Sequence, residues 1–305
     1  MKKTLIFLLI ALFIGEVAQA KGNLWMEFDA KTQTATTRDF SAVPAYIIGT
    51  DDRQEITNKA VGPEKAAVIL ERDGRLWCSG ALVSKNLVLT AAHCLYDQKE
   101  KRFYTRLKAY AVGIAPKTAA ALPRATRHSP TGLIEAAISK RIQAKTAPKE
   151  YLSARVIKTV IPKNYIKYAL YNDDHYLSYK ARNDYGVLVL DEDLGNKTGW
   201  LKISIPSDAE LANAKVTLLG RGQDKPSKTL WKSSGHIGRV EPHFIYHNAD
   251  TIGGNSGSPL FFTKDLSTII GVNIAGRTNT FLGDYKNVAL RTTPELLNSL
   301  QHLKN

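Results

Sequence analysis

The chain has 305 residues, of which 44% are hydrophobic and 23% are charged, and its formal net charge is +14. This length and hydrophobic content are those of a globular protein with one large core or two smaller ones, so a chain that is disordered throughout is excluded. Beyond the N-terminal run no second long apolar segment exists, so a protein that spans a membrane several times is excluded as well.

The N-terminus has the three parts of a secretory signal peptide. Lys2 and Lys3 precede an apolar run from Leu5 to Ile14, and the small-residue site Ala18-Gln19-Ala20 follows. We expect residues 1–20 to be removed after Ala20. A retained anchor is the alternative, but the run is too short to span a bilayer. The mature protein is therefore expected to be secreted or periplasmic, without a transmembrane segment.

A polar arm separates this leader from the expected folded domain. Residues 21–46 are rich in Thr, Gln and Lys and are predicted to be a pro-segment, which suggests a zymogen. Cys78 and Cys94 are the two cysteines of the chain. An even count and an oxidising destination suggest one disulfide, and two buried free thiols are the alternative.

Short β-type runs separated by turns follow in two groups. The first group comprises 67–70, 81–90, 107–114, 156–161 and 185–190, and the second comprises 216–219, 237–240, 244–246, 259–262, 268–274 and 288–290. Closely spaced strands with few helical patterns predict an all-β protein, either a sandwich or a barrel.

One helix is predicted at the end of the chain. Thr293 can cap it, Pro294 suits its first position, and leucines then recur at helical spacing. The polar segment 191–198 is the expected boundary between two β units. The predicted domains are therefore 47–195 and 196–305, with the helix in the second.

A basic stretch interrupts the first unit. Residues 99–149 contain twelve Lys or Arg and two Glu, a net charge of +10, so most of the formal charge of the chain is local. Such a stretch can bind an anionic surface, although no aromatic stacking platform or specific nucleic-acid motif accompanies it. The alternative interpretation is a solvated insertion.

The segment from Asp250 to Pro259 contains a candidate nucleophile. Ser256 lies among three glycines, Gly253, Gly254 and Gly257, which permit positive φ and close approach. A serine attacks a carbonyl only when a base takes its proton and donors stabilise the oxyanion. The N–H groups of Gly254 and Ser256 are expected to form that oxyanion hole. An ordinary Gly/Asn/Ser turn is the alternative.

A histidine in reach of Ser256 is the expected base. His93 lies directly after a predicted strand and beside Cys94, although a histidine of the core is the alternative. No metal site is expected, because His243 and His247 lie on a predicted strand without a third ligand.

Four segments together resemble chymotrypsin-fold (trypsin-like) serine proteases. They are Cys78-Ser79-Gly80-Ala81-Leu82-Val83, Leu87-Val88-Leu89-Thr90-Ala91-Ala92-His93-Cys94, Asn183-Asp184-Tyr185-Gly186-Val187-Leu188-Val189-Leu190 and Gly253-Gly254-Asn255-Ser256-Gly257-Ser258-Pro259. The order His, Asp, Ser is that of chymotrypsin. The spelling around Ser256 is similar to the bacterial glutamyl endopeptidase (V8-like) branch.

The resemblance implies two packed antiparallel β-barrels with a C-terminal α-helix, a Cys78–Cys94 bridge, and a catalytic triad. It implies that Ser256 attacks, that His93 transfers the proton, and that Asp184 orients the imidazole. It also implies that Ile274 to Gly276 pair with the backbone of the substrate.

Substrate preference is less clear from the resemblance. Asp250 matches the carboxylate that selects Arg or Lys in trypsin-like enzymes, or it bonds to backbone instead. Thr251 matches a threonine that binds substrate glutamate in the V8-like branch, but Asn273 replaces the histidine of that branch. Asn255 replaces the aspartate of the trypsin activation switch, so that switch is not expected.

The sequence thus predicts an exported serine endopeptidase that forms an acyl-enzyme, needs no cofactor, and acts on protein or peptide substrates after Arg/Lys or Glu. The alternative is a non-catalytic protein with a protease fold that binds an anionic partner through its basic insertion.

Overall fold

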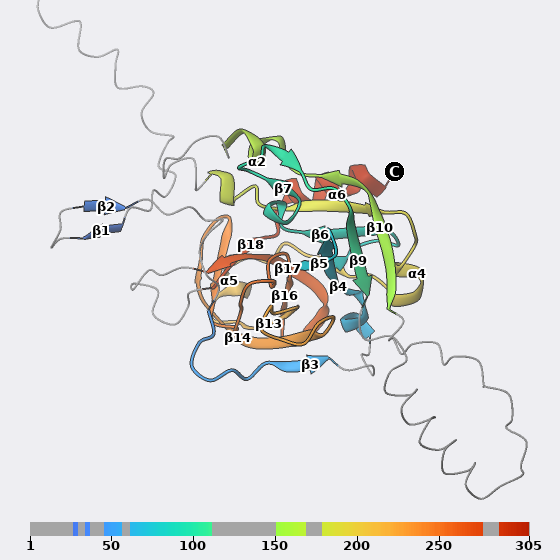
Figure 1. The fold of residues 1–305 in the computed structure, drawn as a ribbon. Coiled ribbons are helices and arrows are strands. Elements are labelled where there is room, and N and C mark those ends of the chain that lie inside the picture. The colour runs from blue at the N-terminus through green and yellow to red at the C-terminus, as the bar shows by residue number, and fades with distance from the viewer. Residues whose placement is uncertain are drawn as a thin grey trace, which may run out of the picture.

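The computed structural model describes residues 27–29, 34–36, 46–56, 62–111, 151–168, 179–276 and 287–304. Within these ranges the dominant elements are β-strands, which form two closed antiparallel barrels (Figure 1). This confirms the all-β prediction. The expected signal peptide, most of the pro-segment and residues 112–149 of the basic stretch lie outside the described residues. Two short strands before the barrels, β1 (Glu27–Asp29) and β2 (Thr34–Thr36), pair with each other.

The first barrel has the strand order β10-β11-β6-β5-β4-β9. Its strands are β4 (Ala67–Arg72), β5 (Arg75–Leu82), β6 (Leu87–Thr90), β9 (Leu107–Ala111), β10 (Leu152–Val160) and β11 (Gly186–Leu190). Asp73 and Gly74 join β4 to β5 with φ of 51° and 79°, the positive angles that a two-residue hairpin turn requires.

One predicted run of the first barrel is wrong as a single strand. The run 81–90 is broken by a turn, in which the Val83 N–H donates to the Leu87 carbonyl at 2.9 Å, so it contributes to both β5 and β6. The sequence did contain a signal for the turn, because the consecutive polar residues Ser84, Lys85 and Asn86 separate the two apolar strands.

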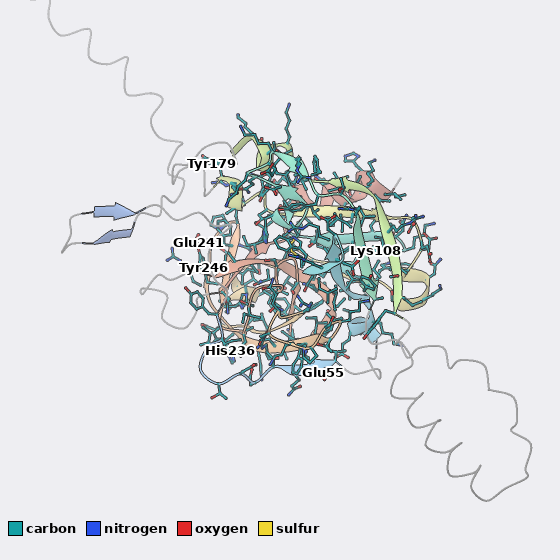
Figure 2. All side chains as sticks on the ribbon, in the orientation of Figure 1. Glu55, Lys108, Tyr179, His236, Glu241 and Tyr246 are labelled. Atoms are coloured by element: carbon teal, nitrogen blue, oxygen red, sulfur yellow. A yellow bond between two sulfur atoms is a disulfide. The ribbon has the colours of Figure 1, made fainter. Side chains whose placement is uncertain are left out.

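The second barrel closes through pairing of β17 with β18. Its strands are β13 (Lys215–Gly220), β14 (Leu230–Val240), β15 (Phe244–His247), β16 (Pro259–Phe262), β17 (Asp265–Gly276) and β18 (Asn287–Arg291). A short strand β12 (Lys202–Ile203) pairs in parallel with β17 at the edge. Figure 2 shows Lys108 on the first barrel and His236 on the second.

Residues 46–56 contact the second barrel, although the sequence placed them at the start of the first unit. Strand β3 (Gln54–Ile56) pairs with β14, with Leu230 opposite Ile56 and Lys232 opposite Gln54. Figure 1 shows β3 at the lower edge of the second barrel, below β14. No local pattern predicts this pairing, because β3 has only three residues and its partner lies about 175 positions away.

The remaining described elements are short. They are the 3-10 helices η2 (Gly62–Ala66) and η3 (Ala92–Cys94), strands β7 (Tyr96–Asp97) and β8 (Arg102–Phe103), and helices α2 (Lys163–Tyr168), α4 (Gly195–Thr198), α5 (Asp208–Leu211) and α6 (Pro294–Lys304). Helix α6 confirms the predicted C-terminal helix. In the ranges that the structure describes, no helix has the length and hydropathy to cross a membrane.

Packing joins the two barrels. A single hydrophobic cluster contains buried side chains of the first barrel, such as Leu89, and of the second, such as Phe261. Leu296 and Leu300 of α6 belong to the same cluster, so the C-terminal helix is held by core packing. The two barrels therefore pack together as the resemblance implies, and the residues between them are held in a fixed arrangement.

Candidate active site

His93 lies in the short helical turn η3, which follows strand β6 of the first barrel. Strand β6 ends at Thr90, and η3 then places the His93 side chain at the surface of the barrel with 18% exposure. The next residue, Cys94, is bonded to Cys78 of β5. This confirms the predicted disulfide and ties the histidine turn to the neighbouring strand.

Asp184 is hydrogen-bonded to His93 twice. Its Oδ2 lies 2.7 Å from His93 Nδ1, and its Oδ1 accepts the His93 backbone N–H at 2.9 Å. Pairing of β11 with β6 brings the two residues together, since Gly186 lies opposite Thr90. A Cβ at Gly186 would lie 2.5 Å from Leu95 Cδ1 and 3.2 Å from the Val160 carbonyl, so a larger residue there would displace the Leu95 side chain. Asp184 is 8% exposed.

The loop that carries Ser256 docks on the first barrel. The Ser79 N–H donates to the Ser256 carbonyl at 2.8 Å, and the Ser79 hydroxyl donates to the Gly254 carbonyl at 2.8 Å. Gly257 has a φ of +82°, and a Cβ there would lie 2.1 Å from Thr90 Oγ1 and 2.2 Å from the Ser79 carbonyl. The loop therefore touches the end of β6, three residues before His93.

The backbone around Ser256 has the shape of an anion site. Gly254 adopts a φ of +97°, and Asn255 Oδ1 accepts the Ile252 N–H at 3.0 Å, which closes the turn. Within the described ranges, the N–H groups of Gly254 and Ser256 donate to no protein acceptor, and Ser256 Oγ makes no hydrogen bond to His93. Two free donors thus lie next to one hydroxyl.

Asp250 bonds to backbone with one oxygen only. Its Oδ1 accepts the Ile48 N–H at 2.7 Å, whereas its Oδ2 is buried without a partner in the described structure. The residue is 3% exposed, and burial raises the pKa of the carboxyl, which the Ile48 bond opposes. Oδ1 thus agrees with the interpretation that Asp250 bonds to backbone. Oδ2 agrees with the interpretation that Asp250 binds a substrate Arg or Lys.

Thr251 is completely buried under the start of the folded chain. Its hydroxyl donates to Asn287 Oδ1 at 2.7 Å, and its N–H donates to the Tyr46 carbonyl at 2.9 Å. Asn287 also donates to the Tyr46 carbonyl at 2.9 Å and accepts the Tyr46 N–H at 3.0 Å. The segment at Tyr46 is thus bound directly to a candidate substrate-binding residue.

Asn273, Ile274 and Gly276 lie on β17, beside the nucleophile loop. The Gly257 N–H donates to the Asn273 carbonyl at 2.7 Å, and the Asn273 N–H donates to the Ser258 carbonyl at 2.8 Å. The Asn273 side chain donates to the Asn255 carbonyl at 3.1 Å, but its Oδ1 is buried without a partner. The register brings the start of the predicted substrate strand, Ile274 to Gly276, next to Ser256.

His247, which the sequence mentioned only as an unsuitable metal ligand, lies in the core behind these residues. Its ring is fully buried, and burial lowers its pKa to about 4, against the opposing effects of Asn273 and the Ala249 backbone. A neutral imidazole is therefore held near Asn273. Only the closed barrel reveals this neighbour, because 26 residues separate the two in sequence.

No candidate metal site includes His243 or His247 in the described chain. One group of potential ligands does occur there, formed by Cys78, His93 and Cys94 with atoms within 4.8 Å of one another. Both cysteines belong to the disulfide, so neither offers a thiolate, and His93 is bonded to Asp184. This set of donors does not fit a zinc ion.

Two residues that the sequence did not single out hold the nucleophile loop. Ser79 bonds to both Gly254 and Ser256, and its hydroxyl accepts the Arg221 N–H at 2.9 Å. Asn287 connects Thr251 with Tyr46. Neither residue has a local signal, although Ser79 lies inside the motif that carries the resemblance to serine proteases.

Two antiparallel six-stranded barrels packed against each other define the chymotrypsin-like class of serine peptidases. The family model described as "Trypsin-like peptidase domain" matches residues 78–272, and the chain belongs to this family. It is a serine endopeptidase, a hydrolase that acts on protein or peptide substrates. The matched range includes His93, Asp184 and Ser256, the three residues of the expected triad.

The chain is also similar to individual proteins. The chain is 27% identical over 262 residues to a glutamyl endopeptidase of Bacillus licheniformis, covering 85% of this chain and 69% of the relative. It is 26% identical over 267 residues to a Bacillus subtilis protein named extracellular metalloprotease, covering 86% and 71%. A solved structure of a Glu endopeptidase in complex with MPD has a TM-score of 0.62 at 22% identity, covering 85% of this chain and 99% of that chain. This structural similarity, at 22% identity, shows the fold alone.

Proposed function

We propose that the chain is an exported endopeptidase in which Ser256 is the nucleophile, His93 the general base and Asp184 the residue that orients His93. The supporting observation is the pair of hydrogen bonds that Asp184 accepts from His93, 2.7 and 2.9 Å long, next to a glycine loop that bonds to the same barrel. A buried carboxylate on Nδ1 fixes the tautomer that leaves Nε2 free to accept a proton.

The reaction follows from this arrangement. Ser256 Oγ attacks the scissile carbonyl while His93 takes its proton, and the N–H groups of Gly254 and Ser256 donate to the oxyanion. His93 then returns the proton to the leaving amine, and an acyl-enzyme remains on Ser256. Water, deprotonated by His93, hydrolyses this ester. The missing bond from Ser256 to His93 forms on substrate binding, as catalytic hydrogen bonds commonly tighten at that step.

The test is covalent labelling with a fluorophosphonate probe, together with peptide hydrolysis. Ser256→Ala is expected to abolish both. Ser258→Ala is the matched control, because this neighbouring serine lies in the same loop and is fully buried. Labelling and hydrolysis should persist in the control. Labelling of Ser256→Ala would overturn the assignment of the nucleophile.

Maturation is the second part of the proposal. Residues 1–20 are removed on export, and residues 21–46 form a pro-segment that is cleaved near its C-terminal end. The bonds of Tyr46 to Thr251 and Asn287 support a start of the folded enzyme at this point. Intact-mass analysis of the active enzyme should give an N-terminus at Tyr46 or Ile47. An active enzyme that retains residues 21–45 would contradict this proposal.

Each of the two candidate substrate preferences depends on one residue. Cleavage after Arg or Lys requires the buried Oδ2 of Asp250, which has no partner in the described chain. Cleavage after Glu requires Thr251, and two similar proteins are named glutamyl endopeptidases. Cleavage-site profiling of a peptide library decides between them, and Asp250→Ser should remove any preference for Arg or Lys. Binding of an anionic surface by residues 99–149 stays a prediction.

A further inference from the structure

A cluster of charged side chains lies beside the nucleophile loop. Arg53 donates to both oxygens of Asp51 at 2.7 and 2.8 Å and to Asp224 at 3.2 Å, and Lys225 donates to Asp51 at 2.7 Å. Together with Arg221, this Arg53 cluster has three cations and two carboxylates. It therefore has one positive charge in excess. Arg53 and Lys225 donate hydrogen bonds to the two carboxylates, and the third cation does not.

That residue is Arg221. It is only 8% exposed, and its Nε and Nη1 are buried without an acceptor among the residues that the structure describes. Burial lowers the pKa of its guanidinium, and Asp224 opposes this through its charge. Asp224 makes its hydrogen bonds to Arg53 instead. A buried guanidinium with free donors is energetically costly unless an anion binds to it.

Arg221 is next to the proposed oxyanion hole. Its backbone N–H donates to the Ser79 hydroxyl, which in turn donates to the Gly254 carbonyl. A Cβ built on Gly254 would lie 3.2 Å from Arg221 Nη1 and 2.7 Å from the Arg221 carbonyl. The unpaired Nη1 donor therefore lies within van der Waals range of the residue whose N–H is proposed to bind the scissile carbonyl oxygen.

The position of Arg221 indicates which part of a substrate it reaches. The acyl side of the substrate is expected along Ile274 to Gly276 of β17, which bonds to the nucleophile loop at Gly257. Arg221 meets the same loop at Gly254 and not at Gly257, through Ser79 of β5, whose neighbour Cys78 forms the bridge to Cys94. Because β17 at Gly257 is assigned to the acyl side, the Gly254 end of the loop is assigned to the leaving-group side.

We propose that Arg221 binds a carboxylate of the substrate on the leaving-group side, so that peptides with an acid just after the scissile bond are preferred. The carboxylate is either an Asp or Glu side chain or the C-terminus of a short leaving peptide. Guanidinium–carboxylate bonds are charge-assisted. Nε and Nη1 lie on different edges of the guanidinium, so the carboxylate accepts from Nη1, the free donor next to Gly254. This inference depends on the proposed serine-protease mechanism.

The test uses quenched fluorescent peptides that are identical up to the scissile bond, with the residue before it chosen by profiling. They carry Glu or Gln at the first or second position after the bond. Wild type is expected to have a Glu/Gln ratio in kcat/KM of about ten, since one charge-assisted bond corresponds to roughly that factor. Arg221→Gln should bring the ratio to about one, and Arg221→Lys should give an intermediate ratio.

A second peptide series separates the two sources of the carboxylate. Peptides that end two residues after the scissile bond are compared with a free and with an amidated C-terminus. Preference for the free acid without a Glu/Gln effect assigns the C-terminal carboxylate, and the opposite result assigns the side chain. Arg155→Gln is the matched control, because it removes an exposed arginine of β10 and should leave both ratios unchanged.

Two results would overturn the inference. One is a wild-type ratio near one in both series. The other is an equal loss on all peptides in Arg221→Gln, which would mean that the charge acts on the oxyanion or on folding. Fluorophosphonate labelling of Ser256 distinguishes these outcomes from failure of the mechanism. If wild type is labelled but does not discriminate, only the role of Arg221 fails; if Arg221→Gln does not fold, Arg221→Lys decides.

Discussion

The two sides of the site differ in how well their buried polar atoms are paired. On the catalytic side, Asp184 uses both oxygens to hold His93. On the side expected to contact substrate, Asp250 Oδ2, Asn273 Oδ1 and Arg221 Nε and Nη1 are buried without partners in the described chain. Buried polar atoms in native proteins are usually hydrogen-bonded, so each exception calls for an explanation.

This difference in the pairing of buried polar atoms agrees with the role of each side in the proposed mechanism. Orientation of His93 must exist before substrate arrives, so its partners belong to the protein itself. Groups that recognise a substrate gain affinity when the substrate supplies the missing partner. The comparison therefore predicts large losses of rate from changes on the paired side and changes of selectivity on the other.

The largest effect is expected from Asp184→Asn. The variant keeps the shape of the side chain, but it loses the negative charge and favours the wrong tautomer of His93, so kcat should fall by about 10⁴-fold. Steady-state hydrolysis of a peptide measures the fall, and thermal unfolding checks that the fold persists. A loss below tenfold would mean that His93 needs no orientation by this carboxylate.

Gly257→Ala should destabilise the junction between the nucleophile loop and the first barrel. A Cβ at this position would lie 2.1 Å from Thr90 Oγ1, in a backbone with positive φ, so the loss is expected to be on the order of 3 kcal/mol or more. Gly199→Ala is the matched control, because Gly199 has a φ of +77° but no atom within 4 Å. The control, with a ψ of −179°, should lose about 2 kcal/mol from the backbone conformation alone. Equal losses in urea unfolding would disprove the close approach.

Removal of the disulfide tests how the turn that carries His93 is held on the catalytic side. Cys78→Ser together with Cys94→Ser opens a loop with a sequence separation of 16 and should lower the free energy of unfolding by about 3 kcal/mol. The turn that carries His93 should also lose its anchor to β5, so kcat should fall. The Glu/Gln ratio in kcat/KM should change less, because it depends on Arg221. Unchanged unfolding would show that packing alone holds this turn.

The smallest effect concerns pH and His247. Its folded pKa of about 4 lies below the ordinary value of 6.5, so the unfolded chain takes up a proton first as the pH falls. Stability should drop between pH 6.5 and 4. Glutamine does not titrate, so His247→Gln should reduce the drop in the free energy of unfolding by about 2 kcal/mol at pH 4.5. Urea unfolding at each pH measures this difference. The lowered pKa of Asp51 acts only below its ordinary 3.8, outside this window. Parallel pH profiles would contradict the expectation.

Much of the fold was predictable because its signals are local. Most strands of both barrels and the C-terminal helix follow from patterns within a few residues, although the predicted runs missed residues 75–80 of β5 and 230–236 of β14. The resemblance carried by the segments around Cys78, His93, Asp184 and Ser256 implied which residues meet, and the His93–Asp184 bonds and the Cys78–Cys94 bridge agree with it.

The partners of the substrate-contacting residues were not predictable, because their contacts join distant segments. Asp250 meets Ile48 across 202 positions, and Arg221 meets Ser79 across 142. No local period of 2.0 or 3.6 residues encodes such pairs, and closing so long a loop depends on the packing of the whole chain.

The sequence by itself determined the all-β class, the order of the candidate catalytic residues and the cysteines of the bridge, because short motifs and strand periodicity specify these features. Only the tertiary structure decided that residues 46–56 lie against the second barrel and that Asp250 bonds to backbone with one oxygen. It alone decided that Nε and Nη1 of Arg221, beside Gly254, have no acceptor in the described chain. The physical reason is that burial and pairing of charges depend on neighbours that only the closed barrels bring together.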